Sequence, residues 1–283
     1  MDPVQTYRER LPPPEIASHV ASVWALEVAS AGPAYEHRTA PNGSVEISYE
    51  LGMDVLHVSG PQRGSTVACV PPGTTVVGMR FRPGAAQAIL GLPTSELVDL
   101  RVEVDRLWGG EPATLGERLA EAGSRRRVEA LLEEEVTRRL VSAPAPDPLV
   151  LAAVGRLRPW LASSVAEPTA DLYVSPRQLR RRFVAALGYG PKTFQRILRF
   201  QGFLALAHAY RDGQVSLARL ARRAGYADQA HLTRECDVLV GLPPRAFLTE
   251  IWRNCGPNHD HEASFAWLRR ALLAPRRRDR PAQ

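Results

Sequence analysis

The stretch from Leu217 to Arg234 carries side chains that can read DNA. Gln229, His231 and Thr233 precede Arg234 near its end. Arginine can donate two hydrogen bonds to guanine O6 and N7, and glutamine can pair with adenine, each contact discriminating by about 1–3 kcal/mol. The same side chain types also bind backbone phosphates. Their grouping on one short segment predicts a surface for nucleic acid.

A helix, a tight turn and a second helix must position these side chains. Apolar residues recur at helical spacing in the first part, namely Leu217, Leu220, Ala221 and Ala224. Gly225 is expected to end this helix in the left-handed conformation, and Asp228 to cap the next one. Leu232 then faces the core. The pattern predicts a helix-turn-helix unit, with an ordinary helical hairpin as the alternative.

A second copy of the pattern precedes this one at a fixed offset of 53 residues. Leu179, Arg181, Gly188, Pro191 and Phe194 are matched by Leu232, Arg234, Gly241, Pro244 and Phe247. A repeat at one period is stronger evidence than any local signal. We therefore predict two helix-turn-helix units joined by a long helix, roughly Phe194 to Tyr210, and the repetition favours DNA binding over the hairpin.

Three motifs carry a family resemblance. They read Ala221-x3-Gly225-Tyr226-x-Asp228-x2-His231-Leu232-x-Arg234, Gly241-Leu-Pro-Pro244-x2-Phe247, and Val174-Ser-Pro-Arg-Gln-Leu179-x-Arg181-x-Phe183 followed by Gly188-x2-Pro191. Over roughly Leu161 to Phe247 the chain resembles the AraC/XylS family of bacterial transcription regulators. The resemblance implies two helix-turn-helix subdomains whose recognition helices enter successive major grooves on one face of the duplex.

The DNA-binding residues are predicted on both recognition helices. They are Arg177, Gln178, Arg180 and Arg181 on the first, and Gln229, His231, Thr233 and Arg234 on the second.

Three residues depart from the family pattern. Pro168 stands where an apolar helix residue is usual, and Tyr173 where the first turn often has glycine. Pro168 predicts a first unit that starts late or is distorted. Together the two residues predict a lower DNA affinity for this unit. Cys236 replaces the usual aromatic residue after the second recognition helix. This replacement is expected to affect only the packing of the core. We therefore predict that the second helix-turn-helix unit is the better-formed of the two DNA-binding units.

The distribution of charge also separates the N-terminal part of the chain from the predicted DNA-binding region. Residues 1–159 carry a net charge of −4, residues 160–255 carry +7, and residues 256–283 carry +3. Basic charge concentrated in one region is the footprint of phosphate binding. High-GC coding explains why Lys192 is the only lysine, but it does not explain the contrast between the regions.

The N-terminal half reads as short strands separated by glycine and proline signals, typical of a small barrel or sandwich. The expected strands are Val20–Val28, Ser44–Glu50, Val55–Ser59, Ser65–Val70 and Val76–Phe81. Two helices should follow, roughly Thr114–Ala122 and Arg125–Ser142. One face of the second, with Val128, Leu131, Leu132, Val136 and Leu140, is either packed on the barrel or a dimer seam.

The predicted fold is α+β with two domains. A β-rich, cupin-like sensor domain with flanking helices spans 1–143, and a proline-rich linker spans 144–150. An all-α domain of two helix-turn-helix units joined by a linker helix spans 151–255. A basic, partly disordered extension spans 256–283.

The family resemblance implies that the β-rich domain senses a small effector and often dimerises. Pro41-Asn-Gly43-Ser-Val-Glu46 and Gly78-x-Arg80-Phe-Arg-Pro-Gly84 resemble N-terminal domains of actinobacterial members. Candidate pocket residues are Trp24, Tyr49, His57 and Arg80. The favoured alternative for each one is that the aromatic rings belong to the core and that Arg80 pairs with a carboxylate.

The sequence predicts no enzyme, metal or cofactor. His19, His37 and His57 lack the spacing of a cupin metal site, and no Walker, dinucleotide or hydrolase motif occurs. Cys255-x3-His259-x-His261 is not a recognised zinc pattern and reads as a loop. Few, scattered cysteines and the absence of a signal sequence or membrane span predict a cytoplasmic protein with no membrane partner.

We therefore expect a sequence-specific transcription regulator that binds double-stranded promoter DNA and answers to a small-molecule effector of unknown identity. RNA polymerase and a second copy of the chain are further candidate partners. One alternative is a regulator controlled by a protein partner. Another is a small-molecule-binding or enzymatic β-barrel with a helical tail that does not bind DNA.

Overall fold

The computed structural model describes residues 5–53, 55–108, 112–157, 174–210, 215–254, 259–261, 263–264, 268 and 272. The first helix expected for the first helix-turn-helix unit lies outside these residues. So do Pro168, Tyr173 and Cys255, on which three of the sequence-based interpretations depend.

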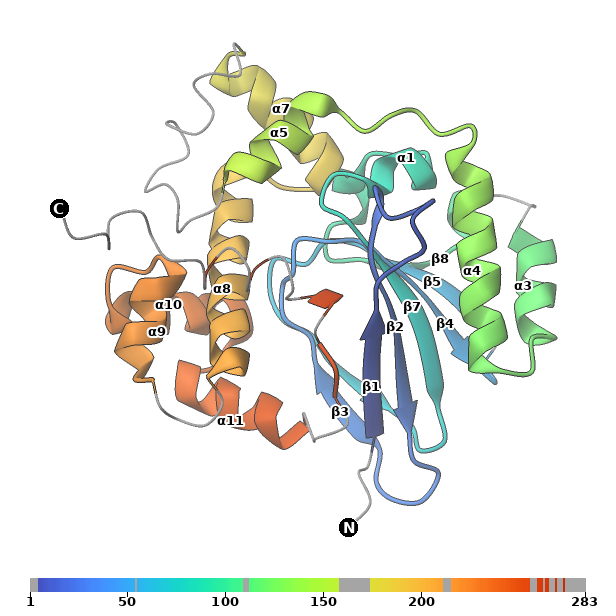
Figure 1. Cartoon of the computed structure of the whole chain (residues 1–283), viewed down its shortest axis with the longest axis horizontal. Coiled ribbons are helices and arrows are strands. Elements are labelled where there is room, and N and C mark those ends of the chain that lie inside the picture. The colour runs from blue at the N-terminus through green and yellow to red at the C-terminus, as the bar shows by residue number, and fades with distance from the viewer. Residues whose placement is uncertain are drawn as a thin grey trace, which may run out of the picture.

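A six-stranded antiparallel sheet forms the centre of the N-terminal half (Figure 1). In sheet order its strands are β1 (Gln5–Arg10), β2 (Val20–Val28), β7 (Thr75–Phe81), β4 (Glu46–Leu51), β5 (Val55–Ser59) and β8 (Arg101–Glu103). A separate ribbon pairs β3 (Tyr35–Arg38) with β6 (Val67–Val70). The half is β-rich as predicted, but the described strands form no closed barrel, because β1 and β8 remain the two edges of the sheet.

Helices cover one face of this sheet. They are α1 (Ala86–Leu90), the short 3-10 helix η1 (Thr94–Leu97), α2 (Asp105–Trp108), α3 (Pro112–Ala120) and α4 (Arg125–Leu140). Val77, Met79 and Phe81 alternate along β7 toward these helices and are fully buried. The apolar face of α4, with Val128 and Leu132, packs into the same core. The interpretation of that face as internal packing is thus confirmed, although against an open sheet and not a barrel, and its buried residues are not available as a dimer seam.

Five strands lie where the sequence predicts them, within two residues at each end. The strands β1, β3 and β8 were not predicted. Their sequences are QTYRER, YEHR and RVE, which lack the β-branched alternation that marks a strand.

The C-terminal half is helical. Its helices are α5 (Pro148–Arg156), α7 (Pro176–Leu187), α8 (Pro191–Ala209), α9 (Leu217–Ala224), α10 (Gln229–Val240) and α11 (Pro244–Asn254). The long α8 is the expected linker helix and begins at Pro191, three residues earlier than predicted. Proline suits this place because the first helical position needs no N–H donor.

Each end of α8 contributes to a separate apolar core. Phe194 and Ile197 pack with Phe183 of α7. Farther along, Phe200 and Phe203 pack with α9, α10 and α11. Since α8 lies between the two cores, it sets the distance between the two helix-turn-helix units (Figure 1).

The two halves of the chain are in direct contact. The Gln201 side chain of α8 donates a buried hydrogen bond of 2.7 Å to the carbonyl of Pro41. Arg38 of β3 forms an ion pair of 2.6 Å with Glu250 of α11. Among the described helices, none combines the length and the apolar character needed to cross a bilayer.

Candidate DNA-binding surface

The second helix-turn-helix unit has the local geometry that the sequence predicts. Ser216 caps α9, and Gly225 ends it with a φ of 92°, in the left-handed region that favours glycine. The Asp228 carboxylate accepts a 2.7 Å hydrogen bond from the backbone N–H of His231 and caps α10. Gly225 and Asp228 flank the turn and together set how α10 leaves it.

Small and apolar residues fill the interface between the two helices of this unit. Ala221 and Leu232 have no exposed surface, so α9 and α10 approach closely between them. Cys236 is also fully buried, and burial raises the pKa of its thiol to about 12. The thiol therefore stays protonated and packs as a small apolar group. This agrees with the expectation that Cys236 concerns packing alone.

The predicted DNA-binding residues of α10 fall into two pairs. Gln229 and Arg234 are exposed, with no side-chain hydrogen bond or ion pair to any described residue. His231 and Thr233 are half-buried. The His231 ring accepts a 3.4 Å hydrogen bond from the Ala227 N–H, and the Thr233 hydroxyl donates to the carbonyl of Gln229 at 3.0 Å. The first pair is thus free to meet a ligand, while the second pair also holds the start of the helix.

The first unit presents arginines on α7. Arg177, Arg180 and Arg181 are exposed, and their side chains make no hydrogen bond or ion pair with the described residues. Gln178 is different, because its side-chain oxygen accepts a 3.1 Å bond from the Ser175 N–H and closes a capping box. The structure therefore gives Gln178 a helix-capping role that the DNA-binding prediction did not consider.

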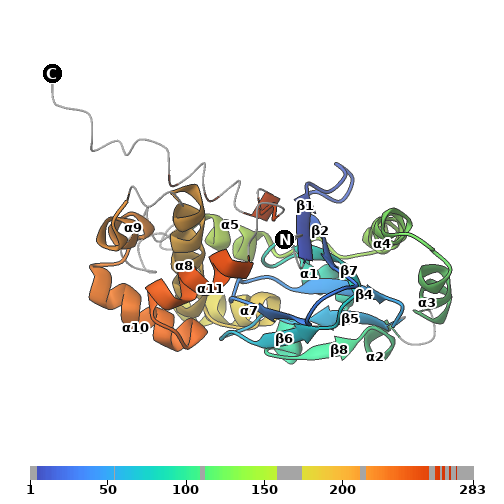
Figure 2. The same cartoon turned by 90° about the horizontal axis from the view of Figure 1, so that it is seen from below.

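Both recognition helices lie on one side of the linker helix. In Figure 2, α7 and α10 lie toward the lower edge of the molecule, and α9 lies above α10. An ion pair of 2.9 Å between Arg196 of α8 and Glu235 of α10 ties the second recognition helix to the linker. The Arg199 guanidinium lies 5.6 Å from the centre of the Tyr226 ring. The sequence carried no local signal for these contacts, because their partners are far apart in the chain.

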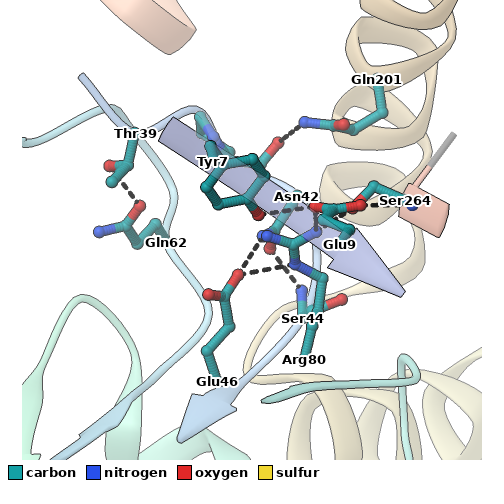
Figure 3. Close-up of polar contacts among 11 residues, drawn as sticks. Tyr7, Glu9, Thr39, Asn42, Ser44, Glu46, Gln62, Arg80, Gln201 and Ser264 are labelled. Atoms are coloured by element: carbon teal, nitrogen blue, oxygen red, sulfur yellow. Dashed lines mark hydrogen bonds and ion pairs between the residues drawn. The ribbon is translucent and has the colours of Figure 1, made fainter. Parts of the chain in front are cut away.

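The four candidate pocket residues of the N-terminal half do not form one site. Tyr49 is buried in the core beneath the helices. Trp24 packs with the aliphatic cluster on the other face of the sheet, and His57 lies 3.1 Å from the guanidinium of Arg101. Arg80 pairs with Glu46 at 2.8 Å and with Glu9 at 3.1 Å (Figure 3). The favoured alternative, a core aromatic and a paired arginine, is confirmed for Tyr49 and Arg80.

The Arg80 cluster is strongly charged and lies away from the recognition helices. Burial disfavours the ionised form of Glu9, but the neighbouring Arg80 and hydrogen bonds from Ser264 and Tyr7 hold its pKa below the usual value. Glu9 is therefore a carboxylate at neutral pH. Among the described residues, no group of three or more histidine, cysteine and acidic side chains is arranged to hold a metal ion.

Two protein families match separate parts of the chain. A family described as "Domain of unknown function (DUF6597)" matches residues 8–103, over most of the sheet. A family described as "Helix-turn-helix domain", of the AraC type, matches residues 169–250. None of the curated proteins is detectably similar to the chain in sequence.

Solved structures of ToxT from Vibrio cholerae show some likeness to most of the chain. A structure of an apo variant is 10% identical, covers 80% of this chain and 97% of its own, and gives a TM-score of 0.42. A second ToxT structure, also 10% identical, covers 87% and 96% with a TM-score of 0.40. Scores of this size are too low to carry an inference about the site.

Proposed function

Since the chain belongs, through residues 169–250, to the AraC-type helix-turn-helix family of DNA-binding regulators, we propose that it is a sequence-specific transcription regulator. In this proposal the two recognition helices, α7 and α10, enter successive major grooves of promoter DNA. The protein works in the cytoplasm, where that DNA lies. Its function is binding, and the proposal includes no catalytic step.

One observation carries the proposal: two helices on the same side of α8 present unpaired side chains of the types that read bases. Arg177, Arg180 and Arg181 extend from α7, and Gln229 and Arg234 extend from α10. Exposed arginines in an isolated hairpin need no function. Two such sets, joined by the linker helix α8, are what binding to two half-sites requires.

We assign different roles to the side chains of α10. Gln229 and Arg234 are the base-reading pair, because nothing described competes for their polar atoms. His231 and Thr233 support the helix and reach phosphates from its first turn. On α7, each of the three arginines contacts either a guanine edge or a phosphate, and Gln178 caps the start of the helix.

The test is Arg234→Ala. Loss of a bidentate guanine contact should weaken binding to a duplex selected from a random library at least about tenfold, consistent with 1–3 kcal/mol per contact. Arg126→Ala is the matched control, since Arg126 is equally exposed but lies on α4, away from α10. Affinity is measured by fluorescence anisotropy at fixed salt, and the Tm of each variant checks its folding. Equal affinities for Arg234→Ala and wild type would refute the assignment.

We further propose that the N-terminal half, residues 1–143, receives the controlling signal from a small-molecule effector or through dimerisation. The linker at 144–150 and the helical domain at 151–255 then pass the signal to DNA. Support comes from the contacts that join the sheet to α8 and α11. A fragment of residues 1–143 that stays monomeric and shows no thermal shift across a metabolite library would contradict this part.

A further inference from the structure

The loop between β5 and β6, residues 60–66, reaches the C-terminal end of the second recognition helix. The backbone N–H of Ser65 donates a 2.9 Å hydrogen bond to the carbonyl of Leu239, and the Ser65 hydroxyl donates to the carbonyl of Val240 at 3.3 Å. Leu239 and Val240 are the last two residues of α10. Carbonyls in the last turn of a helix have no partner within the helix. One residue of the N-terminal half therefore completes the end of α10.

The start of the same loop packs against the end of the first recognition helix. Gly188 follows α7 with a φ of 84°, in the left-handed region. A Cβ atom at Gly188 would lie 2.6 Å from Cγ2 of Val98 and 2.8 Å from Cγ of Pro61, so even a methyl group has no room there. Gly188 also begins the short turn, residues 188–190, that joins α7 to α8. Pro61 and Val98 thus contact the point at which α7 could turn relative to α8.

Asp99 gives this loop a fixed shape. Its carboxylate accepts hydrogen bonds from the Arg63 backbone N–H at 2.8 Å and from the Arg63 guanidinium at 2.6 Å, and its own N–H donates to the carbonyl of Pro61 at 3.2 Å. Among the described residues, Asp99 is the only one other than glycine in the left-handed region, with a φ of 59°. Such a conformation persists where the surrounding contacts fix it. Asp99 therefore holds the backbone from Pro61 to Arg63.

The other end of the loop is tied to Thr39, which follows β3. The Thr39 N–H donates to the carbonyl of Thr66 at 2.9 Å, and the Thr66 N–H donates to the Thr39 hydroxyl at 3.2 Å. The Thr39 hydroxyl also donates to the side chain of Gln62 at 2.9 Å (Figure 3). The loop is thus braced at both ends by contacts within the N-terminal half.

The two helix contacts lie close together on this loop. Pro61 and Ser65 are four residues apart, and an extended chain advances at most about 3.6 Å per residue, so the contacts are separated by no more than about 14 Å. A rotation of α7 relative to α10 must break one of the contacts or deform the loop. The opposite ends of both helices, where Arg177 and Gln229 are exposed, are left uncovered. The loop can therefore set the placement of the recognition helices without blocking them.

We propose that Asp99 and Ser65 are positioning residues for DNA binding. Through residues 60–66, here called the bracket, they fix α7 relative to α10 and so select the spacing between the two half-sites. This inference rests on the proposed function. Two binding units that are held rigidly engage together only at a matching spacing, whereas units with a flexible connection tolerate several spacings.

Asp99→Gly tests the bracket. Glycine adopts a φ of 59° without strain, so the variant keeps this backbone conformation but loses the carboxylate that holds Arg63. Asp99→Asn is the conservative variant, because it keeps an acceptor oxygen for the Arg63 N–H. Asp105→Asn is the control, since it removes the same charge at an exposed residue of α2. The Tm of each variant checks its folding.

Fluorescence anisotropy at fixed salt measures affinity for four duplexes. They are the selected duplex with both half-sites, two versions with one or two base pairs inserted between the half-sites, and a duplex with the second half-site alone. Each inserted base pair moves the half-sites about 3.4 Å farther apart and rotates one relative to the other by about 34°. Amide exchange of Arg63 and Ser65, followed by NMR, reports whether the bracket is intact.

We expect wild type to lose at least about tenfold in affinity when one base pair is inserted, and Asp99→Gly to lose about threefold or less. Asp99→Gly should also speed the exchange of the Arg63 and Ser65 amides and match wild type on the single half-site. Asp99→Asn and Asp105→Asn should resemble wild type. Ser65→Ala, which keeps the backbone donor, should change the spacing dependence more weakly in the same direction as Asp99→Gly.

An Asp99→Gly variant with the full spacing dependence of wild type, or with an equal loss on the single half-site, overturns the proposal. If wild type binds none of the duplexes, the proposed regulator function fails, and amide exchange alone decides the bracket. Slow exchange of the Ser65 amide in wild type that becomes fast in Asp99→Gly then supports the bracket, and equal rates in the two proteins overturn it.

Discussion

Acidification should detach the segment at His259–His261 from β1, a change called opening here, because His261 is buried beside Tyr7 in its neutral form. Burial lowers the pKa of His261 from 6.5 to about 3, and the neighbouring His208, His259 and Arg80 act in the same direction, against Glu9. The histidine side chain therefore binds protons better when this contact is open. Its contribution to the closed contact is complete above pH 6.5 and declines as the pH falls toward 3.

The size of the effect follows from these two values. Between pH 7.5 and pH 5, protonation of a released histidine shifts the closed–open equilibrium by about 30-fold, or roughly 2 kcal/mol. This figure is an upper value, because Tyr7 and His208 keep part of their contact with the ring during partial opening. A contact with β1 that is open in one molecule per thousand at neutral pH would then be open in about three per hundred.

Hydrogen exchange of the Tyr7–Glu9 amides at several pH values, corrected for the intrinsic pH dependence of exchange, measures the equilibrium. His261→Phe keeps a ring against Tyr7 but cannot bind a proton, so its opening should depend much less on pH. His57→Gln is the control, since His57 lies on β5 beside Arg101. Equal protection of the wild-type Tyr7–Glu9 amides at pH 7.5 and pH 5, or a His261→Phe variant with the full pH response, would refute the reasoning.

Two further predictions concern stability. Asp228→Ala removes the cap of α10 and should lower the free energy of unfolding by about 1 kcal/mol, read from urea denaturation, whereas Asp237→Ala on the exposed side of the same helix should change it little. Arg80→Met leaves Glu9 buried without its cation and should cost about 3–5 kcal/mol at pH 8. The loss should shrink toward pH 5, because the unpaired Glu9 then binds a proton in the folded state; a loss independent of pH would contradict the pairing.

The helix-turn-helix units were predictable because their determinants are local. Gly225 and Asp228 act on their immediate neighbours, and the repeat marks both units in the same way. The capping role of Gln178 was also readable, since Ser175 stands three residues before it in a capping-box pattern.

The edge strand β1 and its contact with Ser264 were not predictable from sequence. The strand β1 is polar because Glu9 serves an ion pair with Arg80, 71 positions away, so its residues carry no β signal. Ser264 meets Glu9 across 255 positions, and nothing in the sequence near either residue indicates the other. Contacts of this kind depend on how the two halves pack, which local patterns do not encode.

The position of β1 has a consequence for self-association. An edge strand with unpaired N–H and C=O groups is a template for a strand from another molecule. Residues 259–260 cover part of this edge, Arg8 is exposed along it, and Arg10 pairs with Glu129 and Glu133 of α4. Conditions that detach the C-terminal segment therefore expose an edge strand whose backbone can pair with another molecule. Concentrated protein held at low pH is expected to aggregate through β1.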